Sequence, residues 1–118
     1  MSFDPAEALE RLDGDDELLR EVVGLVHEEW LLQSAALESG LRQSNAPAVA
    51  AAAHSLKGAV SQLSSAGLAE GAAQVERAAR SGDLIAAEAS WRSTAPQIET
   101  LIAAAREWAR GESSQPGI

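Results

Sequence analysis

The chain has 118 residues, a formal net charge of -9 and no cysteine. The length fits one domain with one hydrophobic core, and the lack of cysteine excludes disulfides and thiol chemistry. Nine basic against eighteen acidic residues argue against nucleic acid or an anionic membrane as a partner. No apolar run approaches about 18 residues and no basic segment precedes one, so we expect a cytoplasmic protein without a signal peptide or membrane span.

The composition favours helices over strands, because alanine is abundant, tyrosine is absent and phenylalanine occurs once. Asp4 followed by Pro5 is typical of a helix start, with an N-cap and a proline at the first helical position. A short first helix is therefore predicted, and its apolar side consists of Ala8, Leu9 and Leu12.

A long second helix is predicted from residue 16 to about residue 39, where Ser39 and Gly40 weaken its end, with an extension of the apolar pattern to Leu41 as the alternative. Either Asp15 or Asp16 can cap its start. Its core-facing positions recur at helical spacing and are Leu19, Val22, Val26, Trp30, Gln33 and Leu37.

The third helix is predicted from its N-cap, Asn45, to about Ser64, and the Ser-Ala-Gly sequence at residues 65–67 indicates a break. A fourth helix follows and ends at the turn formed by residues 81–83. Its inward positions are Leu68, Ala72, Val75 and Ala79.

The fifth helix contains Pro96, which removes one backbone hydrogen bond and predicts a kink near residues 92–94. Its core stripe consists of Leu84, Ala87, Trp91, Ile98, Leu101, Ala105 and Trp108. Short connections between long helices predict an all-α, antiparallel up-down-up-down four-helix bundle with a short additional N-terminal helix. We expect residues 1–110 to form a single domain and residues 111–118 to form a disordered tail.

The sequence His-Ser-Leu-Lys-Gly at residues 54–58 lies inside the third helix. The apolar residues nearby mark one buried face, and His54 lies roughly 140° from the centre of that face, so it should point toward water. Lys57 and Ser61 fall on the same side. Gly58 lies one turn above His54 and costs about 1 kcal/mol relative to alanine. It either gives access to the ring or lets another helix pack closely.

Residues 39–69 contain no acidic residue, although the chain as a whole is acidic. Arg42 and Lys57 are the only fixed charges in this segment. A low-charge core helix would produce this pattern by chance. The alternative is a surface around His54 that receives an acidic partner or a phosphoryl group, which nearby carboxylates would repel.

The segment AHSLKGAVSQLSSAGL at residues 53–68 contains a motif of alanine, histidine, leucine, lysine and glycine at fixed positions. With this motif, the chain resembles the histidine-containing phosphotransfer (HPt) domain of bacterial multistep phosphorelays. Further matching positions are Leu63, Leu68, Val75, Glu76, the Gly-Asp-Asp-Glu-Leu-Leu sequence at residues 14–19 and the turn at residues 81–83. The departures from the family pattern are Ser64-Ser65 in place of Gly-Ala, Val26 in place of an aromatic residue, and Pro96.

The resemblance implies that His54 accepts a phosphoryl group from a receiver-domain phosphoaspartate and passes it to another receiver. Lys57 would offset phosphoryl charge and Gly58 would give steric access, while Glu76 would orient the imidazole or simply pair with Arg80 at i, i+4. The supporting residues are Glu76, Ser61 and Arg80.

The resemblance further implies a monomeric phosphocarrier without ATP-dependent kinase activity of its own. Its partners would be receiver domains of response regulators or hybrid histidine kinases. It would need no cofactor and no metal, because the magnesium belongs to the receiver.

Other functions fit the sequence less well. The dimerisation region of a sensor kinase would carry an acid directly after its histidine, whereas Ser55 follows His54. A metal-binding bundle would need inward Glu-x-x-His pairs, which the sequence lacks. A helical docking adaptor that is not phosphorylated stays open as the alternative.

Overall fold

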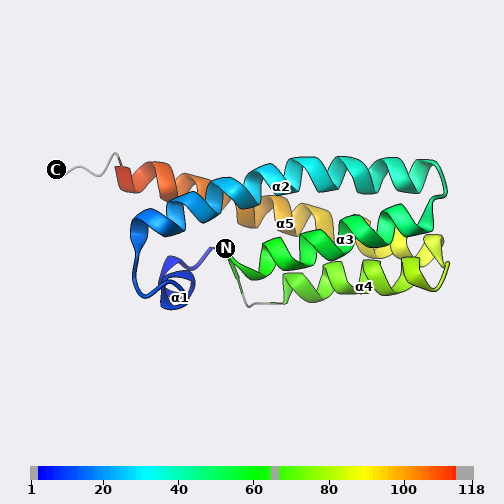
Figure 1. The fold of residues 1–118 in the computed structure, drawn as a ribbon, viewed down its shortest axis with the longest axis horizontal. Helices are drawn as coiled ribbons and strands as arrows, with labels where there is room; N and C mark the ends of the chain where they lie inside the picture. The colour runs from blue at the N-terminus through cyan, green and yellow to red at the C-terminus, as the bar shows by residue number, and fades with distance from the viewer. Residues whose placement is uncertain (1–2, 65–66, 114–118) are drawn as a thin grey trace.

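The computed structural model describes residues 3–64 and 67–113, and within these residues all regular structure is helical. Figure 1 shows one short and four long helices. Their bounds are α1 Pro5–Glu10, α2 Asp16–Arg42, α3 Ala46–Ser61, α4 Leu68–Arg80 and α5 Leu84–Ser113. The all-α fold predicted from the sequence is confirmed.

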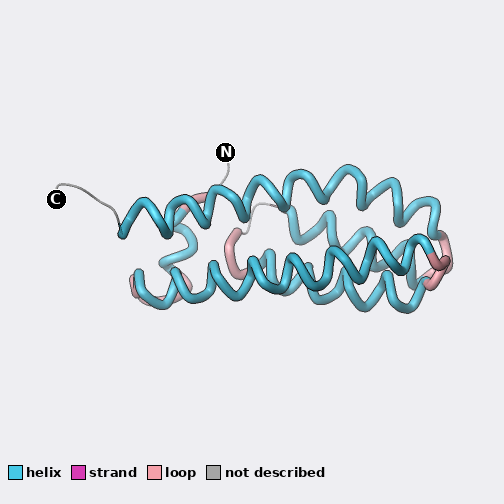
Figure 2. The backbone as a smooth tube through the Cα atoms, turned by 90° about the horizontal axis from the view of Figure 1, so that it is seen from above, coloured by secondary structure: helices cyan, strands magenta, loops and turns pink. Residues whose placement is uncertain are grey.

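The four long helices form an elongated bundle that measures 53 × 21 × 21 Å. Each long helix runs opposite to the one before it (Figure 1), and the α2–α3 and α4–α5 turns lie together at one end (Figure 2). Along the bundle, α2 packs on α3, α3 on α4 and α4 on α5, and contact between α5 and α2 closes the ring. This is the up-down-up-down arrangement that short connections favour.

The predicted N-caps are present at three helix starts. The side chains of Asp4, Asp15 and Asn45 accept hydrogen bonds from backbone N–H groups in the first turns of α1, α2 and α3. At the start of α4, Gly67 has a φ of 98°, a left-handed conformation that glycine adopts without strain. The other two residues of the predicted break at this point lie outside the described residues.

Two helix ends differ from the prediction. α2 continues through Gly40 to Arg42, because Gly40 is buried where α2 meets α3, and a Cβ there would lie 2.9 Å from Cγ2 of Val49. This glycine permits close packing and does not end the helix. α3 ends at Ser61, before the predicted Ser64, because the chain tightens there into a turn in which Leu63 N–H donates to Val60 O.

The core is built from the predicted stripes with two differences on α2, where Val23 is buried and both Val22 and Gln33 are only partly so. Trp30 of α2 and Trp91 of α5 lie with ring centroids 5.7 Å apart near the middle of the core. The largest fully buried side chains are Trp91, Leu19, Leu37, Leu56, Leu63, Ile98, Val23, Val26, Val49, Val60 and Val75.

α5 continues through Pro96 as one helix, so the predicted kink does not interrupt it. Gln97 Nε2 donates to Ser93 O at 2.9 Å in this stretch. α5 extends to Ser113, three residues beyond the boundary predicted at residue 110. Residues 114–118 of the predicted tail lie outside the described residues.

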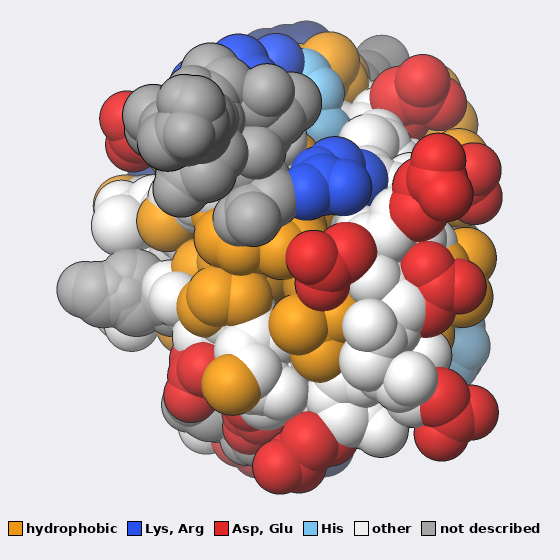
Figure 3. Space-filling view, turned by 90° about the vertical axis from the view of Figure 1, so that its left-hand side faces the viewer, with side chains coloured by type: hydrophobic (Ala, Val, Ile, Leu, Met, Phe, Trp, Pro, Cys, Tyr) orange, Lys and Arg blue, Asp and Glu red, His pale blue; other side chains and the backbone are white. Residues whose placement is uncertain are grey.

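α1 and Phe3 lie at one end of the bundle. The Phe3 ring packs edge-on against Trp108 of α5 at 5.7 Å, and the Arg20 guanidinium lies over the same indole at 5.5 Å. Figure 3 looks at this end and shows hydrophobic side chains gathered near its middle, with acidic side chains along its right-hand side.

Candidate functional site

His54 projects from the middle of α3 into solvent, and 61% of its side chain is exposed. Its neighbours Ala53 and Leu56 are each 1% exposed and anchor the opposite face of the helix in the core. The predicted orientation of His54 toward water is therefore confirmed. An imidazole in this position is accessible to a partner in solution.

Glu76 reaches the imidazole from the neighbouring helix α4. Its Oε2 lies 3.2 Å from Nδ1 of His54, although the two residues are 22 positions apart in the sequence. A carboxylate only accepts hydrogen bonds, so the contact assigns a proton to Nδ1. In the neutral ring this tautomer leaves the lone pair on Nε2, the nitrogen farther from the backbone.

Glu76 also binds two cations. Lys57 Nζ lies 3.2 Å from Oε1, and Arg80 donates to Oε2 from Nε at 3.0 Å and from Nη2 at 2.8 Å. The hydrogen bonds from Arg80, and then those from Lys57, lower the pKa of Glu76 to about 2, against the opposing effect of burial. Glu76 therefore stays ionised at neutral pH although only 9% of its side chain is exposed.

The four side chains of His54, Lys57, Glu76 and Arg80 form one polar cluster on the α3–α4 surface. Two fixed cations against one carboxylate leave this cluster net positive beside the imidazole. Glu76 makes both contacts that the sequence suggested for it. Its carboxylate contacts His54, and it also pairs with Arg80 at i, i+4.

Gly58 is exposed next to the cluster, and a Cβ added to it would meet nothing within 4 Å. The alternative that Gly58 serves close helix packing is therefore wrong. Gly71 shows the contrast, because its Cβ would lie 2.5 Å from Oγ1 of Thr94. Ser61 is exposed at the end of α3, and its hydroxyl donates to the Lys57 carbonyl at 2.8 Å, which places it outside the cluster around His54.

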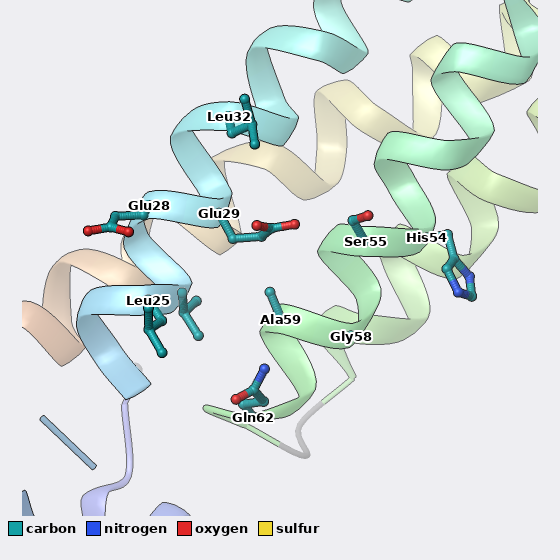
Figure 4. A pocket seen from close by; sticks show the side chains of 10 residues that line it. Leu25, Glu28, Glu29, Leu32, His54, Ser55, Gly58, Ala59 and Gln62 are labelled. Carbon is teal, nitrogen blue, oxygen red and sulfur yellow. The ribbon is translucent and has the colours of Figure 1, made fainter. Parts of the chain in front are cut away.

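A groove of about 580 Å³ runs between α2 and α3 and reaches His54 at its rim. In Figure 4, Glu29 points from α2 across the groove toward α3, Glu28 points away from it, and the His54 ring lies on the far side of α3. The lining residues are Leu25, Val26, Glu28, Glu29, Leu32, His54, Ser55, Gly58, Ala59 and Gln62.

The α2 wall of this groove was not predicted from the sequence, because only the core-facing positions of this helix were assigned. Leu25 and Leu32 are each 64% exposed, an unusual state for large aliphatic side chains in the middle of a helix. The signal available was their spacing: Leu18, Leu25 and Leu32 follow one another at seven-residue intervals, beside the residues that form the core stripe.

The described residues form neither a metal-binding cluster nor a membrane-spanning helix. Within residues 3–64 and 67–113, no group of three or more His, Cys, Asp or Glu side chains is arranged to hold a metal ion. None of the helices in the described part of the chain has the length and apolar character required to cross a membrane.

Comparison with known proteins identifies the family. The family model of the Hpt domain matches residues 17–108, which span α2 to α5 and include the whole polar cluster. Comparison with curated proteins and with solved structures gave no match. Hpt domains act in histidine phosphotransfer in phosphorelays, where they interact with receiver domains as phosphocarriers and not as kinases. The chain belongs to the Hpt domain family.

Proposed function

We propose that Nε2 of His54 accepts a phosphoryl group from the phosphoaspartate of one receiver domain and passes it to an aspartate of another. The observation that carries this proposal is the 3.2 Å contact between Nδ1 of His54 and Glu76. It directs the ring's lone pair to Nε2, on an imidazole that is 61% exposed.

The reaction needs no proton transfer at the attacking atom. The Nε2 lone pair forms a bond to phosphorus, and the bond from phosphorus to the aspartyl oxygen breaks with its electrons going to the departing carboxylate. The ring then carries positive charge with its proton still on Nδ1, where the Glu76 carboxylate stabilises it. The reverse steps deliver the phosphoryl group to the second receiver.

Lys57 and Gly58 serve the transfer in different ways. Lys57 follows His54 by one turn of α3 and is 37% exposed, so its ammonium can move from Glu76 toward a phosphoryl oxygen. The open space over Gly58 lets the receiver's loops approach the ring. Arg80 holds Glu76 through two hydrogen bonds and thereby positions it toward His54.

The proposal includes a monomeric protein of the cytoplasm that has no ATP-dependent kinase activity of its own. The magnesium ion that assists transfer sits on the receiver, so the chain itself uses no cofactor. Its partners are receiver domains of response regulators or hybrid histidine kinases.

The test is the intact mass of the chain after mixing with a phosphorylated receiver domain from its own organism and magnesium at neutral pH. We expect a gain of one phosphoryl group that is lost in acid and is absent in His54→Gln, whose helicity stays unchanged. Acceptance by His54→Gln would refute the assignment of the acceptor. No gain with several receivers would favour the docking-adaptor function instead.

A further inference from the structure

The groove between α2 and α3 contains carboxylates but no fixed cation. Its ten lining residues include Glu28 and Glu29 and no lysine or arginine. Lys57 and Arg80, the nearest fixed cations that the site uses, both bind Glu76 on the α4 side of α3. The surface around His54 therefore has a basic side toward α4 and an acidic side toward α2.

Glu29 is the acid that faces into the groove. Figure 4 shows its carboxylate directed across the groove toward α3, whereas the neighbouring Glu28 points away. Gln33, one turn later on α2, donates to Glu29 Oε2 at 3.1 Å and fixes the side chain in this direction. Among the described residues, Glu29 has no cationic partner.

A protein that docks over His54 must cover this groove if it is to bury Leu25 and Leu32, which flank Glu29 on α2 at 64% exposure each. Covering the groove removes water from the Glu29 carboxylate as well. Burying a carboxylate without a cation is costly, and no cation of the described residues pairs with Glu29, since Arg11 at the Gln62 end of the groove donates to the Gln62 carbonyl. The partner has to bring one.

We propose that Glu29 is a specificity-determining residue, which selects receiver domains that present a lysine or arginine between two apolar side chains. The apolar side chains cover Leu25 and Leu32, and the basic side chain reaches into the groove to Glu29. The receiver's acidic phosphorylation site then faces Lys57, so the two charged ends fix the orientation of the partner. This inference rests on the proposed phosphotransfer function.

The probes are the receiver domains of the same organism, each phosphorylated with phosphoramidate and magnesium. The variant is Glu29→Gln, which keeps an oxygen for the Gln33 hydrogen bond and removes the charge. Glu21→Gln is the matched control, because it makes the same charge change on an exposed side chain of α2 that does not line the groove. The readout is kcat/KM for phosphoryl transfer to His54, at low and high salt.

For the receiver that transfers best to the wild-type chain, we expect Glu29→Gln to lower kcat/KM by about tenfold or more, as for loss of one interfacial charge pair. Glu21→Gln should change kcat/KM less than about twofold, and the difference between the two variants should shrink at high salt. Replacing the receiver's basic residue by alanine should lower the rate similarly, and combining both changes should cost little more than either alone.

Equal effects of Glu29→Gln and Glu21→Gln would overturn the role of Glu29 and leave phosphotransfer intact. Additive effects of Glu29→Gln and the receiver's alanine substitution would do the same. A wild-type chain that accepts phosphate from no receiver would overturn both proposals. Incubating the chain with phosphoramidate alone distinguishes this case from an unreactive histidine, because direct phosphorylation of His54 needs no docking of a receiver.

Discussion

Glu76 of α4 holds Nδ1 of His54 at 3.2 Å with one carboxylate oxygen, and the same oxygen accepts both hydrogen bonds from Arg80. The orientation of the imidazole is thus coupled to an ion pair on the neighbouring helix. A change at Glu76 should alter the chemistry of His54 while leaving the ring exposed.

We expect Glu76→Gln to slow phosphoryl transfer roughly tenfold, because the hydrogen bond that Nδ1–H of His54 donates to the charged carboxylate contributes about 1.5 kcal/mol or more. The ring should also lose its preference for the Nδ1–H tautomer, which ¹⁵N spectra of the histidine side chain report directly. Glu70→Gln is the control, since Glu70 is an ion-paired carboxylate on the same helix that bonds Arg77. An unchanged tautomer and rate in Glu76→Gln would remove Glu76 from the mechanism.

The lowered pKa of Glu76 makes the stability of the fold depend on pH. Its pKa is about 2 in the folded chain against an ordinary 4.5, so the unfolded chain binds the proton more tightly and folding is favoured where Glu76 is ionised. This stabilisation is complete above pH about 4.5 and disappears as the pH falls through about 2.

Denaturant unfolding of the wild-type and Glu76→Gln proteins, measured between about pH 2 and about pH 7, tests this dependence. The wild-type chain should be more stable at neutral pH, and the difference in unfolding free energy should narrow below pH about 4.5. Other carboxylates, such as Glu38 with its pKa lowered mainly by the Trp91 hydrogen bond, cancel in this comparison. A difference that stays constant down to pH 2 would contradict the assignment to Glu76.

Local patterns predicted the positions that depend on one helix alone. The apolar periodicity around His54 predicted its exposure, and the caps Asp15 and Asn45 marked two helix starts. The contact between His54 and Glu76 depends on the register of α3 against α4, which spacing along one helix does not determine; the family resemblance suggested it. Gly40 was misread for the same reason, because its close neighbour Val49 belongs to another helix. The groove wall at Leu25 and Leu32 was not predicted, because both leucines are exposed and lie outside the apolar stripe that faces the core.

Gly58→Leu should slow transfer from a receiver domain without unfolding the bundle. A Cβ at this position meets no atom within 4 Å, so the new side chain starts in the open space next to the His54 ring. It should raise helix stability by somewhat less than about 1 kcal/mol, because leucine favours a helix more than glycine does. Thermal melts and transfer kinetics together test both expectations.

Gly24→Leu is the control for Gly58→Leu, since Gly24 also lies inside a helix with nothing within 4 Å of an added Cβ. It should gain similar stability and keep the wild-type transfer rate. If the two variants transfer equally fast, steric access at Gly58 has no part in the reaction.

Lys57→Ala should slow transfer or shorten the lifetime of phosphohistidine, because it removes the ammonium group that can reach a phosphoryl oxygen from the next turn of α3. Rapid-quench kinetics measure the first effect and the decay of the phosphorylated mass measures the second. Arg77→Ala removes an exposed cation paired with Glu70 on α4 and should change neither. Wild-type values for both quantities in Lys57→Ala would leave Lys57 as a surface charge.

Gly71→Ala should destabilise the bundle by about 1–3 kcal/mol, the usual cost of an overpacked contact. Its Cβ would lie 2.5 Å from Oγ1 and 2.9 Å from Cγ2 of Thr94, so α4 has to move away from α5. Gly24→Ala, with open space around it, should instead stabilise by up to about 1 kcal/mol. Urea unfolding of the two variants gives the comparison. A gain in stability for Gly71→Ala would mean that α4 and α5 are farther apart in solution than this packing requires.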